Sequence, residues 1–238
     1  MLIFIKKWNL VLLVLILAAG TFSLGLLSRK NYVMETMSVP GYGKRIIIDA
    51  GHGAPDGGAE GQSGVLEKDL NLAIARYLQG YLEQGGADIV LTRSDDDGIY
   101  DSNSKTIRQK KRSDLKNREI LMQKSSSELF VSIHMNKFSD GKYSGPQVFY
   151  SPNHPSSKAL ADAVQKEMNR CLNPPASRTI KQGGKDIYLL SKAEIPAILI
   201  ECGFLSNQRE EQLLLDEQYQ KQVAWSIYCG LLTYLAET

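Results

Sequence analysis

Short apolar runs alternate along the chain with longer segments in which apolar residues recur every three or four positions. Such short runs, rich in β-branched residues and leucine, are typical of buried strands. They cover residues 45–49, 88–92, 129–134, 147–150, 187–190 and 197–201. Several are apolar almost throughout, as expected of strands covered by helices on both faces. The pattern therefore predicts a sheet with mostly parallel strands.

Between these runs the apolar spacing changes to that of amphipathic helices. One stripe extends from Leu66 to Tyr81, and the glycines of EQGGA mark its end. Similar stripes cover residues 156–172, 207–215 and 219–235. Strands that alternate with helices predict the α/β class: a single domain with a mostly parallel twisted sheet flanked by helices.

The N-terminal 30 residues have a different composition from the rest. Two lysines precede an uncharged stretch over residues 8–28, which as a helix would span about 30 Å, enough to cross a bilayer core. A short apolar core followed by Ala-Ala-Gly also fits a cleavable signal peptide. We expect residues 1–30 to be a signal peptide or signal anchor, 31–43 a linker, and 44–238 the folded domain, exported across the cytoplasmic membrane.

Residues 95–118 form a long irregular insert between predicted elements. The insert begins DDDGIYDSNS and continues as the basic run KTIRQKKRSDLKNR. The charge pattern alone favours a solvated basic helix. Insertions of this length in compact domains are also typical of functional elements, so a flap or groove wall facing an anionic polymer is the alternative.

Charge and cysteine content exclude several kinds of site. The formal net charge is only +2, which argues against a nucleic-acid partner. The cysteines are far apart and form no CxxC pair, so they predict neither a disulfide framework nor a cysteine zinc site. They are Cys171, Cys202 and Cys229.

Three predicted strands end in a residue that can do chemistry. IIIDAGHG ends at His52, LFVSIHMN carries His134, and AILIECGF carries Glu201. Because ligands of open α/β sheets bind outside the carboxyl ends of the strands, these side chains are candidates for one site. Two histidines and a carboxylate can bind a divalent metal such as zinc and leave a position open for water.

The pattern alone leaves alternatives open for each residue. A histidine at a strand end can be a hydrogen-bonded core residue, and a buried glutamate can form a structural salt bridge. Glu67, at the start of a predicted helix, can simply complement the helix dipole, and Glu60 or Asp56 could supply an acid equally well. His154 lies in the Pro-rich loop SPNHPS and is interpreted as a surface residue.

Four sequence blocks together resemble the zinc-dependent N-acetylmuramoyl-L-alanine amidases of the amidase-3 family. The blocks are IIIDAGHGAPDGGAEG, LEKDLNLAIA, LFVSIHMN and IPAILIECGFLSN. They occur in the family's order and span nearly the whole chain from Lys44 onward. The insert, the short length and the absence of a wall-binding module resemble most the CwlD type, the spore-cortex amidases of endospore-forming bacteria.

The resemblance implies a role for individual residues. His52, Glu67 and His134 match the family's ligands for one zinc ion per chain, and Glu201 matches its catalytic acid. Asn136 is a candidate for substrate binding or for orienting His134, with a structural role in the turn equally open.

The sequence departs from the commoner family pattern at three positions, none of which is a ligand position. They are Ala50 and Ala54, where proline and glycine are usual, and Cys202, where a small or hydroxylated residue is common. We expect these differences to affect loop stiffness or substrate fit rather than the metal.

The implied reaction is hydrolysis of the amide between the lactyl group of N-acetylmuramic acid and L-alanine of the peptidoglycan stem peptide. The CwlD likeness implies a step toward muramic-δ-lactam in the spore cortex, with a deacetylase acting downstream. The expected location is outside the cytoplasmic membrane around the forespore, with possible membrane anchoring and an accessory protein. Two alternatives stay open: another zinc amide hydrolase, such as a sugar N-deacetylase or a peptidase, and a non-catalytic peptidoglycan-binding protein.

Overall fold

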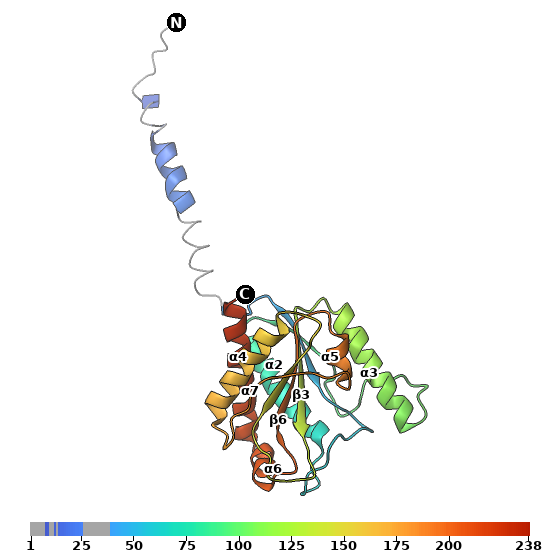
Figure 1. Ribbon diagram of the computed structural model, residues 1–238. Coiled ribbons are helices and arrows are strands. Elements are labelled where there is room, and N and C mark those ends of the chain that lie inside the picture. The colour runs from blue at the N-terminus through green and yellow to red at the C-terminus, as the bar shows by residue number, and fades with distance from the viewer. Residues whose placement is uncertain (1–7, 10–11, 13, 26–38) are drawn as a thin grey trace. The chain divides into compact units, whose positions relative to one another are not determined.

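The computed structural model describes residues 8–9, 12, 14–25 and 39–238 (Figure 1). The chain divides into two units, Met1–Val39 and Pro40–Thr238. In the first unit, residues 14–25 are helical. No helix of the described residues combines the length and the apolar character that a membrane span requires. Residues 1–7, 10–11, 13 and 26–30 of the predicted signal segment and residues 31–38 of the predicted linker lie outside the described residues.

The second unit is built on a six-stranded sheet with the order β2-β1-β3-β6-β4-β5. Strands β1, β2, β3 and β6 are parallel, β4 is antiparallel to β6, and β5 is parallel to β4. The strands are β1 Arg45–Ala50, β2 Asp88–Leu91, β3 Leu129–Asn136, β4 Gln147–Tyr150, β5 Lys181–Gln182 and β6 Ala197–Phe204. The predicted α/β class with a mostly parallel sheet is confirmed.

Helices cover both faces of this sheet (Figure 1). They are α2 Glu67–Gln84, α3 Ile107–Lys124, α4 Ser157–Leu172, α5 Tyr188–Lys192, α6 Gln208–Leu215 and α7 Glu217–Ala236. Helices α2, α4 and α7 pack together on one face, where they enclose the larger apolar core. Helices α3 and α5 pack on the opposite face over a smaller apolar cluster.

The alternation of side chains along β1 explains how one strand serves both faces. Ile46, Ile48 and Ala50 point into the larger core, whereas Ile47 points to the α3 side. Because successive side chains alternate, Asp49 also faces α3. The sequence thus places one carboxylate in the middle of a buried sheet, where it is costly unless it is paired.

Helix α3 supplies the partner of this carboxylate. Arg118 is 1% exposed and donates to Asp49 Oδ1 at 2.5 Å and to Asp114 Oδ2 at 2.7 Å. Ser132 Oγ and Thr92 Oγ1 also donate to Asp49. Burial by itself raises the pKa of Asp49, but Arg118, with smaller contributions from His134 and Ser132, holds the pKa below its ordinary value. The buried ion pair therefore ties α3 to the centre of the sheet.

Two details of the sequence prediction are wrong. Residues 187–190 lie at the start of helix α5 rather than in a strand, because a four-residue apolar run carries no readable period. The strand that the sequence did not predict is β5, Lys181–Gln182, because its two polar residues form no apolar run.

The insert at 95–118 is also less irregular than expected. From Ile107 onward it is the helix α3, which begins with a capping box between Thr106 and Gln109. The prediction of a basic helix is confirmed for its exposed side, whereas Arg118 is buried and structural.

Replacing Arg118 tests the importance of this ion pair. Arg118→Met leaves Asp49 charged and unpaired, and we expect it to lower the free energy of unfolding by about 3–5 kcal/mol. The melting temperature should fall by roughly 10 °C, as measured by circular dichroism. The double variant Asp49→Asn/Arg118→Met should be less destabilised than Arg118→Met. An Arg118→Met variant as stable as Lys124→Ala, which removes an exposed cation from the same helix, would contradict this account.

Candidate metal centre

Three predicted ligands meet at the carboxyl edge of the parallel strands. His52 follows β1, His134 lies near the end of β3, and Glu67 is the first residue of α2. Glu67 Oε2 is 3.2 Å from His52 Nε2, and Glu67 Oε1 is 2.9 Å from His134 Nδ1. One donor atom from each residue lies within 4.8 Å of the others. The fold thus brings together two imidazoles and one carboxylate from distant parts of the sequence.

The glycine-rich loop before α2 fixes the direction of the Glu67 side chain. Ala59 donates its N–H to Glu67 Oε2 at 2.8 Å, and Met135 donates its N–H to Oε1 at 3.0 Å. Burial opposes ionisation of this carboxyl, yet the hydrogen bonds with His134 and His52 hold the pKa of Glu67 below its ordinary value. Glu67 is therefore a buried carboxylate aimed between the two histidines.

The other acids and the third histidine have different places. Asp56 Oδ2 lies 2.9 Å from His52 Nδ1 and so orients the imidazole from its far nitrogen. Glu60 is exposed. His154 follows β4, which runs antiparallel to β6 and so ends at the opposite edge of the sheet. Of these three acids, Glu67 is the one whose carboxyl oxygens lie within 3.2 Å of both histidine rings.

The charges around His52 fit a divalent cation. Although burial lowers the pKa of His52, hydrogen bonds with Asp56 and Glu67 raise it to about 9. The pocket therefore favours a positive charge between its carboxylates. The donor set of two imidazoles and one carboxylate suits zinc, and the partly exposed imidazoles leave the site open on one side.

Glu201 lies beside this cluster. It pairs in register with His134 across β3 and β6, so both side chains emerge on the same face of the sheet. Its Oε2 is buried and has no hydrogen-bond partner among the described residues. Burial raises the pKa of Glu201 to about 7, and the neighbouring Glu67 carboxylate adds to the shift, which the histidines partly offset. A buried carboxyl without a partner is suited to exchange a proton near neutral pH.

Asn136 lies just beyond His134, where the register between β3 and β6 shifts. Its backbone carbonyl accepts a hydrogen bond from Leu205 N–H at 2.8 Å. This contact ties the loop after β3 to the end of β6 and is independent of the side chain.

Comparisons with known proteins identify the family of the chain. The family model of N-acetylmuramoyl-L-alanine amidase, Amidase_3, matches residues 46–233. The chain belongs to this family. The germination-specific N-acetylmuramoyl-L-alanine amidase of Bacillus subtilis (strain 168) is 39% identical over 207 residues, which are 87% of this chain and 86% of that protein.

Solved structures of N-acetylmuramoyl-L-alanine amidases also share the fold. The CwlD amidase from Clostridioides difficile, solved in complex with the GerS lipoprotein, is 45% identical with a TM-score of 0.79, over 82% of this chain and 100% of that chain. The catalytic domain of CwlV from Bacillus (Paenibacillus) polymyxa var. colistinus is 34% identical with a TM-score of 0.70, over 82% and 99% of the two chains. Membership of this amidase family confirms the prediction of an enzyme.

In this amidase the turn that presents His52 is strained. His52 has φ +63°, in the left-handed region that costs an L-residue roughly 1 kcal/mol or more. Gly51, just before it, has no room for a side chain because a Cβ there would overlap the His134 ring. Gly58 packs against Glu67, where a Cβ would lie 2.6 Å from Oε2. The backbone must therefore be held in a conformation that it would not adopt alone.

Arg93 connects the two chain segments that carry His52 and Glu67. This arginine is 3% exposed and donates to Ala50 O at 2.9 Å, Gly51 O at 3.1 Å and Lys68 O at 2.7 Å. It makes no salt bridge with any described residue, and its hydrogen bonds go to backbone carbonyl oxygens. A buried guanidinium thus fixes the end of β1 relative to the first turn of α2.

Two further donors complete this arrangement. Arg118 donates to Ala50 O at 2.8 Å and to His52 O. Asn71 Nδ2 donates to Gly51 O at 3.0 Å. The sequence pattern does not single out Arg93, although this residue directly follows the predicted strand 88–92 and so marks a fourth strand end at the same edge.

Arg93 variants test whether these hydrogen bonds position the metal ligands. Arg93→Ala frees the carbonyl oxygens of residues 50, 51 and 68, and we expect about 10- to 100-fold weaker zinc binding, measured by competition with a chromophoric chelator. Arg93→Lys, which cannot form the same fork, should give an intermediate loss. Arg170→Ala, an exposed arginine on α4, is the control. Unchanged zinc affinity in folded Arg93→Ala would refute the positioning role.

Proposed function

We propose that this amidase uses zinc to hydrolyse the amide between the lactyl group of N-acetylmuramic acid and L-alanine of the peptidoglycan stem peptide. One observation carries the proposal. The unpartnered carboxyl of Glu201 lies in register with His134, directly beside the cluster of His52, Glu67 and His134. A metal site and an adjacent proton acceptor are the parts that amide hydrolysis by water requires.

His52, Glu67 and His134 would hold the zinc ion. When bound there, zinc supplies a Lewis acid that can lower the pKa of water to about 7 and stabilise developing negative charge on the substrate. Glu201 accepts a proton from the attacking water and returns it to the L-alanine nitrogen as the amide bond breaks. Its burial supports both steps, since a pKa of about 7 lets the carboxyl accept and release a proton at neutral pH.

The neighbouring side chains keep these groups in place. Asp56 orients the His52 ring through Nδ1, and backbone N–H groups orient Glu67. Asn136 is proposed to contact the substrate from the end of β3, two residues beyond His134 and in register with Phe204 of β6.

The proposed biological setting is the spore cortex. Its support is the 39% identity to a germination-specific amidase of Bacillus subtilis and the 45% identity to the CwlD amidase of Clostridioides difficile. Removal of the stem peptide would leave a free lactyl carboxyl on muramic acid. A deacetylase acting downstream would free the amine that closes with it to muramic-δ-lactam.

The proposed location is outside the cytoplasmic membrane around the forespore, with residues 1–30 as the export signal or membrane anchor. Since the Clostridioides difficile CwlD amidase is found with the GerS lipoprotein, an accessory protein of that kind is proposed for this chain as well.

Product analysis tests the reaction. The full-length chain is incubated with spore peptidoglycan after chelation, with and without added zinc, and the products are identified by mass spectrometry. We expect stem peptides with a free L-alanine amine only when zinc is present. Glu201→Gln should retain zinc and lose about 100- to 10,000-fold in turnover, because proton transfer in this kind of reaction contributes that much.

The results that would overturn the proposal are specific. Release of acetate would indicate a sugar deacetylase, and cleavage between amino acids would indicate a peptidase. A Glu201→Gln variant that keeps a tenth of the activity would refute the role of Glu201 as the proton acceptor.

A further inference from the structure

Helix α3 and helix α5 enclose a basic groove. The groove has a volume of about 650 Å³ and is lined by Arg108, Lys111, Arg112, Leu115, Lys116 and Tyr188. We call it the α3–α5 groove. Five of the six residues come from α3, at positions separated by three, one, three and one residues, so they form one face of the helix.

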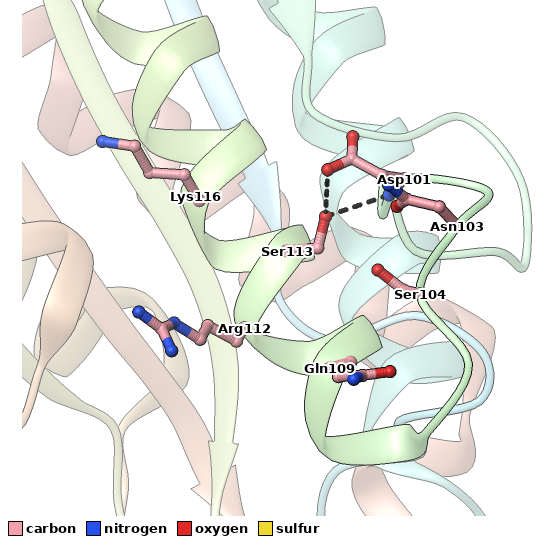
Figure 2. Close-up of a pocket in the computed structure, with 7 residues that line it drawn as sticks. All are labelled: Asp101, Asn103, Ser104, Gln109, Arg112, Ser113 and Lys116. Carbon is pink, nitrogen blue, oxygen red and sulfur yellow. Dashed lines mark hydrogen bonds between the residues drawn. The ribbon is translucent and has the colours of Figure 1, made fainter.

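The side chains of α3 line two hollows, which share Arg112 and Lys116. A smaller one of about 400 Å³ lies next to the 101–104 loop and includes Ser113 and Gln109. In Figure 2, Arg112 and Lys116 extend to the side of α3 that faces away from Asp101 and Asn103. The two cations line both hollows, and their side chains extend from the loop side of α3 toward the α3–α5 groove.

The positive charge of the groove is only partly balanced. Lys116 pairs with Glu119 at 3.0 Å, but Arg108 and Arg112 form no salt bridge with any residue that the structure describes. Lys192 of α5 adds a cation on the other wall, 5.9 Å from the centre of the Tyr188 ring. A concave surface with unpaired guanidinium groups favours an anion, and the fork of arginine matches the two oxygens of a carboxylate.

Lys111 connects the groove to the metal centre. Its Nζ lies 3.0 Å from Asp56 Oδ2, and the same oxygen lies 2.9 Å from His52 Nδ1. The first two turns of α3 therefore stand next to the metal-ligand turn. One wall of the α3–α5 groove is therefore linked through Asp56 to His52, and a peptide of two or three extended residues reaches about 7–11 Å.

We propose that the α3–α5 groove binds the acidic stem peptide of the substrate through its carboxylates. This inference rests on the proposed function. Of the two parts joined by the scissile amide, the N-acetylated sugar side carries no charge while its lactyl carboxyl is in the amide. The peptide side carries the free carboxylates. Leu115 and Tyr188 supply apolar surface for the aliphatic parts of the peptide, and the arginines supply the anion contacts.

Paired substrates measure this recognition. The full-length chain with zinc is given two muramoyl peptides of the same sequence, one with free side-chain and terminal carboxylates and one with these groups as amides. Arg112→Ala should lower kcat/KM for the acidic peptide about fivefold, mainly through KM, and for the amidated peptide less than twofold. Arg112→Glu should lower kcat/KM for the acidic peptide more than tenfold. High salt should reduce these differences.

Lys124→Ala is the matched control, since Lys124 is an exposed cation at the end of the same helix and lies outside the groove lining. It should change neither value more than twofold. The inference would be overturned if the unmodified enzyme hydrolysed the acidic and the amidated peptide at the same rate and the Arg112→Glu variant did so too.

Calorimetric titration with the free acidic peptide separates the inference from the reaction. If Arg112→Glu weakens binding of this peptide but the chain cleaves no muramoyl amide, the role of the groove is retained and the proposed reaction is rejected. Binding that Arg112→Glu leaves unchanged would reject the groove even if the amide is cleaved.

Discussion

Buried hydrogen-bond donors hold the backbone carbonyl oxygens at the end of β1, and the proposed metal centre depends on them. Arg93 and Arg118 both donate to Ala50 O, Arg93 and Asn71 donate to Gly51 O, and Arg118 donates to His52 O. Without them, the strained turn at His52 would relax. The arginines reach this turn from different directions, since Arg93 follows β2 and Arg118 lies on α3. The position of His52, one of the proposed ligands, is thus set by donors from three places: Arg93 after β2, Asn71 on α2 and Arg118 on α3.

The same region shows why two neighbouring glutamates can have different roles. Glu67 receives hydrogen bonds from the backbone and lies between two imidazoles, which favour its ionised form. Glu201 has a buried oxygen without a partner, and burial raises its pKa to about 7. Environments that push two carboxyl pKa values apart are typical of sites where one carboxyl stays ionised and the other transfers protons.

The sequence predicted the fold class. It also predicted that His52, His134 and Glu201 lie at one edge of the sheet, because each follows or ends a recognisable apolar strand. It could not choose Glu67 over Glu60 or Asp56 by pattern. That choice depends on how the glycine-rich loop turns before α2.

The basic insert was also only partly predictable. Its charge indicates a surface helix, but nothing in the local sequence distinguishes buried Arg118 from exposed Arg112. The difference arises because Asp49, far away in the sequence, lies beneath one face of α3. Burial of a single charged residue in an otherwise solvated helix is decided by its tertiary partner.

Anomalous diffraction at the zinc absorption edge, from crystals of the full-length chain grown with zinc, tests the central claim most directly. The account predicts one strong peak per chain, about 2.0–2.2 Å from a nitrogen of His52, a nitrogen of His134 and an oxygen of Glu67. A peak at His154 or at the cysteines, with none between His52 and His134, would contradict it.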